Sequence, residues 1–136
     1  MSHKLEFEKV VLYDTGESGI PVNVELRLGS QFAAFEAKID TGASFCIFAR
    51  EHGEKLGIII ESGFLRYFNT TTGTFRAFGH GITLATEGFH FDSQVFFAAD
   101  ENFQTNLLGR HGWLDRVIVG INDYDGKLYL SRYESE

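Results

Sequence analysis

Strict alternation of apolar and polar side chains along residues 22–28, Val-Asn-Val-Glu-Leu-Arg-Leu, constrains the fold more than any other feature of the sequence. Successive side chains of a β-strand point to opposite faces of a sheet, so this run predicts a strand with one buried face. Gly29 and Ser30 then turn the chain, and residues 32–39 return as the second arm of a hairpin. Fifteen glycines are scattered among further short apolar runs, which favours more strands and tight turns over long helices.

A second hairpin and several further strands are predicted along the rest of the chain. Residues 64–68 and 74–78 are rich in apolar side chains and flank the polar stretch 69–73, which predicts a hairpin with an exposed tip. The other expected strands are residues 5–13, 58–60, 82–85, 89–98, 117–121 and 127–133.

Helices are expected to be few and short. The best candidate is residues 49–56, with Gly57 at the position where a helix stops. A short helical turn is expected after Leu107-Leu108-Gly109-Arg110. Many short strands with at most two short helices predict an all-β fold, closed or sandwich-like, in a single domain over residues 1–136.

The charge of the chain argues against nucleic acid and membranes as partners. The net charge is −7, whereas phosphate binding needs a basic surface. No cluster of more than two Lys or Arg residues occurs, and no apolar run reaches the roughly 18 residues that a bilayer-crossing helix needs. Residues 1–9 alternate charged and apolar side chains without the apolar core of a secretion signal. We therefore expect a soluble, cytoplasmic protein.

Cysteine and histidine usage predicts no metal site and no cofactor. Cys46 is the only cysteine, which excludes an internal disulfide and a cysteine-based zinc site. It lies on an apolar run, where a cysteine is more often a buried small side chain than a nucleophile. The five histidines show no metal-binding spacing such as His-x-x-x-His.

The stretch 38–44, Lys-Ile-Asp-Thr-Gly-Ala-Ser, is the best candidate for a catalytic site. A strand delivers the carboxylate of Asp40 to the end of a sheet, Gly42 permits a tight turn close to a substrate, and the Thr41 hydroxyl can fix the loop by hydrogen bonding. A single carboxylate is a poor general acid and base. Two carboxylates in contact share one proton, so one can activate a water while the other protonates the scissile carbonyl.

The pattern of an apolar residue followed by Asp-Thr-Gly-Ala-Ser after a hairpin resembles the aspartic peptidases. The chain length resembles the single-domain, retropepsin-like branch, whose members are homodimers with one Asp from each subunit. Two further features agree in the same order: the polar hairpin tip, which resembles the flap over the substrate, and residues 107–110, which resemble the apolar-apolar-Gly-Arg segment before the C-terminal helix. The resemblance covers roughly residues 20–132.

This resemblance implies an acid-protease closed barrel, present as one lobe with a flap hairpin. It implies an aspartic endopeptidase that hydrolyses polypeptides through an Asp dyad across a homodimer. Asp40 would be the catalytic residue. The residues implied to support it or to bind substrate are Thr41, Gly42, Ala43, Thr72 and Gly73.

Two positions depart from the family pattern. Ser44 stands where retroviral members often carry an acidic residue that pairs with the arginine equivalent to Arg110, so the resemblance gives Arg110 no partner. The polar C-terminal residues 132–136 also differ from the termini that interleave in the retroviral dimer, so the mode of dimerisation is left open.

A second Asp-Thr-Gly occurs at residues 14–16. Glu17, Ser18 and Gly19 follow it in place of a buried apolar run, and no hairpin precedes it, which favours a surface turn. An Asp14–Asp40 pair within one chain is the less favoured arrangement.

Two other functions are compatible with the same sequence. One is a non-catalytic peptide-binding or dimerisation module on the same fold. The other is a small-ligand β-barrel, which would enclose an apolar cavity. Phe75 and Phe78, beside the hairpin tip, are candidates either for lining a substrate groove or for core packing.

Overall fold

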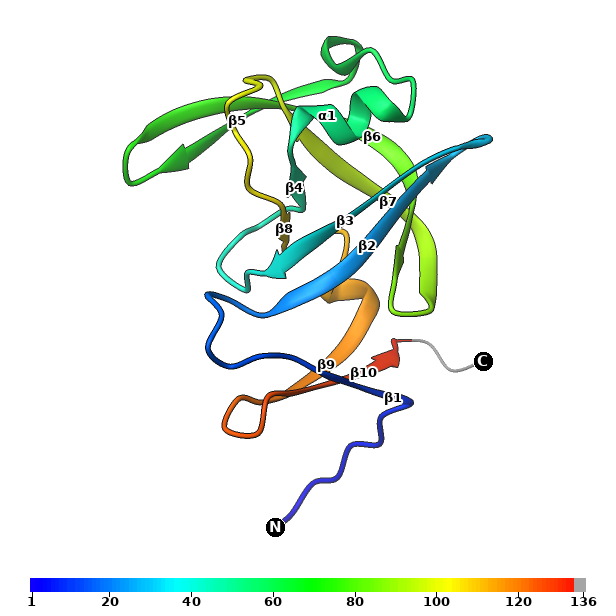
Figure 1. Ribbon diagram of the computed structural model, residues 1–136, viewed down its shortest axis with the longest axis vertical. Helices are drawn as coiled ribbons and strands as arrows, with labels where there is room; N and C mark the ends of the chain where they lie inside the picture. Colours follow the sequence, from blue (N-terminus) through cyan, green and yellow to red (C-terminus); the bar gives the residue numbers. More distant parts are fainter. Residues whose placement is uncertain (134–136) are drawn as a thin grey trace.

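Strands make up most of the computed structural model, which describes residues 1–133 (Figure 1). The strands within these residues are β1 (Lys9–Leu12), β2 (Pro21–Leu28), β3 (Gln31–Ile39), β4 (Ile47–Phe48), β5 (Phe64–Thr70), β6 (Gly73–Thr86), β7 (Phe89–Ala98), β8 (Leu107–Leu108), β9 (Val117–Asn122) and β10 (Lys127–Arg132). The helices are α1 (Arg50–Lys55) and the 3-10 turns η1 (Ile60–Ser62) and η2 (Leu114–Arg116). The expected all-β fold with very few helices is confirmed.

The strands form two sheets. The larger has the order β2-β3-β8-β4-β7-β6-β5, and the smaller has the order β1-β10-β9. In the larger sheet β2 also pairs with β6, through Val24–Arg27 and Thr83–Thr86. This additional pairing curves the sheet, while its closure into a barrel stays a prediction.

The β2–β3 hairpin forms as the alternating sequence predicts. Its antiparallel register runs from Pro21 opposite Lys38 to Leu28 opposite Gln31. Val22, Val24 and Leu26 are buried on the core side of β2. This hairpin positions the catalytic candidate, because β3 leads directly into residue 40.

The single strand β6 replaces two expected strands, residues 74–78 and 82–85. Gly79, His80 and Gly81 lie between these two runs, and the sequence analysis assigned them to no strand. A Cβ atom on Gly79 would lie 2.7 Å from the Gln94 side chain and 3.0 Å from the Phe96 ring, so glycine permits the close approach of β7 while the strand continues. β6 therefore connects the tip of the second hairpin to the core (Figure 1).

The smaller sheet joins the two ends of the described chain. β1 pairs with β10 through Lys9–Leu12 and Lys127–Leu130, so the expected strand over residues 5–13 is shorter than predicted. Leu128 and Leu130 on β10 are buried in the core. Figure 1 shows this sheet at the end of the molecule opposite α1. The last three residues of the expected C-terminal tail and of the expected domain lie outside the described residues.

The expected strand over residues 58–60 is wrong. Ile60 begins a 3-10 turn instead, and its side chain is buried against α1, where a Cβ atom on Gly53 would lie 2.6 Å from Ile60 Cδ1. Arg50 of α1 holds this turn, because its guanidinium bonds Glu61 and the Ala99 carbonyl oxygen. Among the described residues, no helix combines the length and apolar character needed to cross a membrane.

Candidate active site

Asp40 lies where β3 ends, on a loop supported from behind by β8. Lys38 and Ile39 pair in parallel with Leu107 and Leu108, and the Asp40 N–H donates a hydrogen bond to the Leu108 carbonyl oxygen at 3.0 Å. The position of the carboxylate is therefore set by two strands that are about 70 residues apart in the sequence.

A tight turn fixes the Asp40 side chain. The Gly42 N–H donates to Asp40 Oδ1 at 2.9 Å, and the Ala43 N–H donates to the Asp40 carbonyl oxygen at 3.1 Å. The Thr41 side chain is exposed and forms no hydrogen bond within residues 1–133, so the backbone holds this turn without the hydroxyl contact that the sequence suggested. The second carboxylate oxygen of Asp40 has no hydrogen bond from residues 1–133.

The segment Gly109-Arg110-His111 clamps the loop after the turn. The Arg110 N–H donates to the Ala43 carbonyl oxygen at 2.9 Å, and the His111 N–H donates to the Ser44 carbonyl oxygen at 2.8 Å. A Cβ atom on Gly109 would lie 2.3 Å from the Phe45 carbonyl oxygen, so only glycine allows the two segments to pack this closely. The Arg110 side chain is exposed and forms no ion pair within residues 1–133, as the absence of an acid at Ser44 suggests.

A groove of about 460 Å³ lies above this loop and below the β5–β6 hairpin. Aromatic side chains from four parts of the chain line its apolar walls: Phe45, Phe68, Phe75 and Phe103. They touch one another, with ring centroids 6.0 Å apart for Phe45 and Phe68 and 4.8 Å apart for Phe75 and Phe103. The groove therefore suits large apolar groups beside a carboxylate.

The predicted site residues divide into two groups. Asp40, Gly42 and Ala43 line the groove, whereas Thr41, Thr72 and Gly73 do not. At the hairpin tip, the Thr70 hydroxyl donates to the Gly73 carbonyl oxygen at 2.9 Å. The functional roles of all six residues stay predictions.

The sequence missed several residues of the groove wall. Phe45 and Leu107 line the groove, although the sequence analysis gave neither a substrate-binding role. Arg66 gave no signal at all, because it stands alone in a run of apolar residues that predicts only a strand. Of the two aromatic residues considered beside the tip, Phe75 lines the groove and Phe78 is buried.

The turn at residues 14–16 is separate from the groove. Residues 14–19 are all exposed, and Asp14 is not among the groove-lining residues. Cys46, which follows the Asp40 loop in the sequence, is fully buried, and this burial raises the pKa of its thiol to about 12. Within residues 1–133, no group of three or more His, Cys, Asp or Glu side chains is placed to hold a metal ion.

Two solved proteases have a similar fold. The crystal structure of a retropepsin-like aspartic protease from Rickettsia conorii matches with a TM-score of 0.67 and 19% identity, over 90% of this chain and 96% of that chain. EIAV protease complexed with the inhibitor HBY-793 matches with a TM-score of 0.55 and 19% identity, over 74% of this chain and 88% of that chain. No family model and no curated protein matches the sequence. The chain therefore has the retropepsin-type fold, as the motif order predicted.

Proposed function

We propose that this protein is an aspartic endopeptidase whose active site forms between two copies of the chain. The observation that carries the proposal is the position of Asp40, on a rigid turn at the floor of an apolar groove, with a β-hairpin above it. The retropepsin-type fold of two proteases supports the same conclusion.

The content of one groove supports the proposed homodimer. Asp40 is the only carboxylate among the residues that line it, and a single carboxylate does not supply both the acid and the base. A second copy would bring its own Asp40. Strand β1 offers a surface for such a copy, because Val10 and Leu12 are 48% and 72% exposed on an edge strand.

The reaction would use the two carboxylates in different protonation states. The unprotonated Asp40 accepts a proton from a water, and the water oxygen attacks the carbonyl carbon of the peptide. The protonated Asp40 donates its proton to the carbonyl oxygen. The Asp40 that took the water proton gives it to the amide nitrogen, and the other Asp40 takes a proton back from a hydroxyl of the tetrahedral intermediate. The C–N bond breaks, and the products are a carboxylic acid and an amine. The hydrogen bond from the Gly42 N–H to Asp40 Oδ1 holds the carboxylate in place, and the other carboxylate oxygen takes up and releases the proton.

The substrate is proposed to be an extended polypeptide with large apolar side chains near the scissile bond. The four phenylalanine rings form the walls that such side chains would contact. The hairpin tip, with Thr72 and Gly73, would contribute main-chain hydrogen bonds to the peptide, in the manner of an added strand. The Gly42 carbonyl oxygen would accept one from the peptide backbone.

Mixing the wild-type chain with the Asp40→Asn variant tests the shared site. If each site needs two Asp40 residues, an equal mixture at fixed total concentration and after subunit exchange should keep about one quarter of the wild-type activity. The measurement is peptide cleavage across a series of mixing ratios. Activity proportional to the wild-type fraction would mean that one chain suffices and would overturn the shared dyad.

A non-catalytic peptide-binding module is the alternative function. It is favoured if the wild-type chain binds peptides but cleaves none of a diverse library between pH 3 and 8, roughly the range in which carboxylates titrate. Sedimentation analysis over the same concentrations then separates a binding homodimer from a monomer with half a site.

A further inference from the structure

We propose that Arg66 binds an acidic side chain of the substrate, which makes it a specificity-determining residue for peptides that carry Glu or Asp beside an apolar segment. This inference rests on the proposed function, since it assumes that a peptide occupies the groove above Asp40. Four observations support it: the direction of the Arg66 side chain, its place between two grooves, its free hydrogen-bond donors and the charge around it.

The Arg66 side chain points from the hairpin toward the catalytic loop. Arg66 lies in the middle of β5, opposite Ala77 on β6, which is fully buried. Its guanidinium carbon lies 4.5 Å from the centroid of the Phe45 ring and 5.9 Å from that of Phe96. Phe68, two residues further along the same strand, contacts the same two rings. Arg66 therefore lies on the face of the hairpin that covers the groove.

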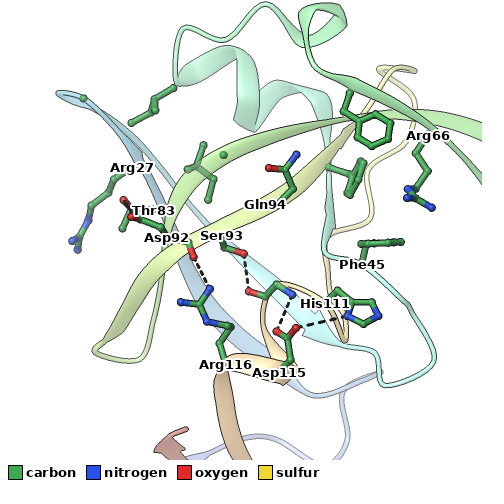
Figure 2. A pocket seen from close by; sticks show the side chains of 17 residues that line it. Arg27, Phe45, Arg66, Thr83, Asp92, Ser93, Gln94, His111, Asp115 and Arg116 are labelled. Carbon is green, nitrogen blue, oxygen red and sulfur yellow. Dashed lines mark hydrogen bonds and ion pairs between the residues drawn. The ribbon is translucent and has the colours of Figure 1, made fainter. Parts of the chain in front are cut away.

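Arg66 and Phe45 are the two residues that line both grooves of this face. One groove contains Asp40, and a larger one of about 1050 Å³ extends past Gln94. Figure 2 shows Arg66 at the edge of the larger groove, next to Phe45. A peptide long enough to leave the Asp40 groove in this direction must pass the guanidinium of Arg66.

The donors of Arg66 are free, unlike those of the other cations in the larger groove. Arg27 pairs with Glu25 at 3.0 Å, and Arg116 donates to the Asp92 carbonyl oxygen at 2.6 Å. His111 lies 3.7 Å from an oxygen of Asp115. Within residues 1–133, no carboxylate and no carbonyl oxygen accepts a hydrogen bond from Arg66.

Stacking on Phe45 orients the guanidinium without using its donors. A cation held against the face of a ring keeps its five N–H groups at its edge, in a planar fork that matches the two oxygens of a carboxylate. The ring contact also restricts the side chain before a ligand binds, so less conformational entropy is lost on binding.

The charges that line the Asp40 groove should make the preference for an acidic residue depend on its position in the peptide. Asp40 and Arg66 are the two charged residues among those that line the Asp40 groove. Asp40 disfavours a second carboxylate near the scissile bond, whereas Arg66 favours one at its own end of the groove. An acidic residue should therefore help at one position of the peptide and hinder at positions next to the scissile bond.

The test compares peptides that differ only by Glu or Gln at one position. The substrates share one apolar core, and the exchange is placed at each position on either side of the cleaved bond. For the wild-type protein we expect kcat/KM to be about tenfold higher with Glu than with Gln at one position, because a hydrogen-bonded charge pair forms. This ratio should fall as salt is added, since ions screen a partly exposed pair.

Variants of Arg66 should change this ratio. Arg66→Gln should bring it to about one, and Arg66→Glu should invert it. Arg76→Gln is the matched control. Arg76 lies on the same hairpin and near a phenylalanine ring, at 5.9 Å from Phe78, but it lines neither groove. Its replacement should leave the ratio unchanged.

The outcomes separate this inference from the proposed function. Cleavage by the wild-type protein with no Glu preference at any position overturns the role of Arg66 and leaves the peptidase standing. If no peptide is cleaved, the proposed peptidase function is overturned. Calorimetric measurement of the binding of the same peptide pairs then tests the role of Arg66. Equal binding of Glu and Gln peptides, or no binding, would then overturn the inference as well.

Discussion

The same tripeptide, Asp-Thr-Gly, forms the same local structure twice in this chain. In each copy the glycine N–H donates to the Asp Oδ1, at 2.8 Å for Asp14 and 2.9 Å for Asp40. In each copy the Asp carbonyl oxygen accepts from the N–H three residues later, at 3.2 Å in the first and 3.1 Å in the second. The tripeptide alone therefore specifies the turn and the direction of the carboxylate.

The surroundings of the two turns differ completely. The Asp40 turn follows a paired strand, is backed by Leu108 and is clamped by residues 109–111. The residues of the Asp14 turn and those after it, 14–19, are all exposed. What distinguishes a candidate catalytic carboxylate from a surface turn is thus the long-range support, which comes from residues about 70 positions away.

Removing each carboxylate should give the largest difference between the two turns. Asp40→Asn should lower kcat/KM by about 10³-fold or more, because the dyad loses a group that transfers a proton. Asp14→Asn should leave kcat/KM within about twofold. Both variants should show wild-type thermal unfolding curves, which would exclude misfolding. If Asp14→Asn folds normally but loses activity, the catalytic carboxylate belongs to the Asp14 turn and not to the Asp40 turn.

Substitutions that disturb the packing around each turn should have the next largest effect. Gly109→Ala places a Cβ atom 2.3 Å from a backbone oxygen of Phe45 and 2.8 Å from that of Ala43, so we expect it to destabilise the protein by roughly 2–4 kcal/mol. Gly16→Ala meets only its own Asp14 side chain, at 3.2 Å, and should cost less than about 1 kcal/mol. Urea unfolding midpoints measure both. Equal losses in the free energy of unfolding would mean that residues 109–111 pack no more tightly on the Asp40 loop than the surroundings of a surface turn do.

The smallest effect should come from the side chain of the residue directly before the first turn. Tyr13 donates to Asp123 at 2.6 Å, and this bond raises the pKa of Tyr13 from 10.0 to about 12. A raised pKa means that the protonated tyrosine is stabilised by folding. Its contribution is therefore complete below pH 10, the unfolded value, and is lost as the pH rises toward 12.

The variant Tyr13→Phe isolates this contribution. Its melting temperature should be slightly below that of the wild type at pH 8, and the difference should vanish between pH 10 and 12. Peptidase activity should not change, since the turn it supports is the exposed one. A difference that grows with pH would contradict the assignment of the hydrogen bond.

Local patterns predicted the fold class and the turn, and they failed where packing decided the structure. The alternation in β2 and the Asp-Thr-Gly turn depend on nearest neighbours, so the sequence predicted both. Gly79 interrupts a pattern in the sequence but not in the strand, because the room it leaves is filled by Gln94 and Phe96 from β7. The apolar run at residues 58–60 was compatible with either a strand or a buried turn, and contact with α1 decided for the turn.

The groove wall was harder to predict than the turn at Asp40. Phe45, Phe68 and Phe103 come from a loop, a strand and a second loop, and no spacing in the sequence places them together. Arg66 stands in a strand whose residues are almost all exposed, where an arginine is ordinarily solvated. Its contact with the Phe45 ring forms only when the hairpin folds over the loop that carries Phe45, so the sequence alone does not reveal it.

The continuous path of β6 implies a graded rate of amide hydrogen exchange along one strand. Residues 73–76 pair only with β5, residues 77–79 pair with both β5 and β7, and residues 83–86 pair with both β7 and β2. Exchange should therefore be fast at the tip and slowest at the core end, where opening must break two ladders at once. The hairpin can open at its tip while its base stays closed, which would allow a peptide to enter without unfolding the sheet that carries Asp40.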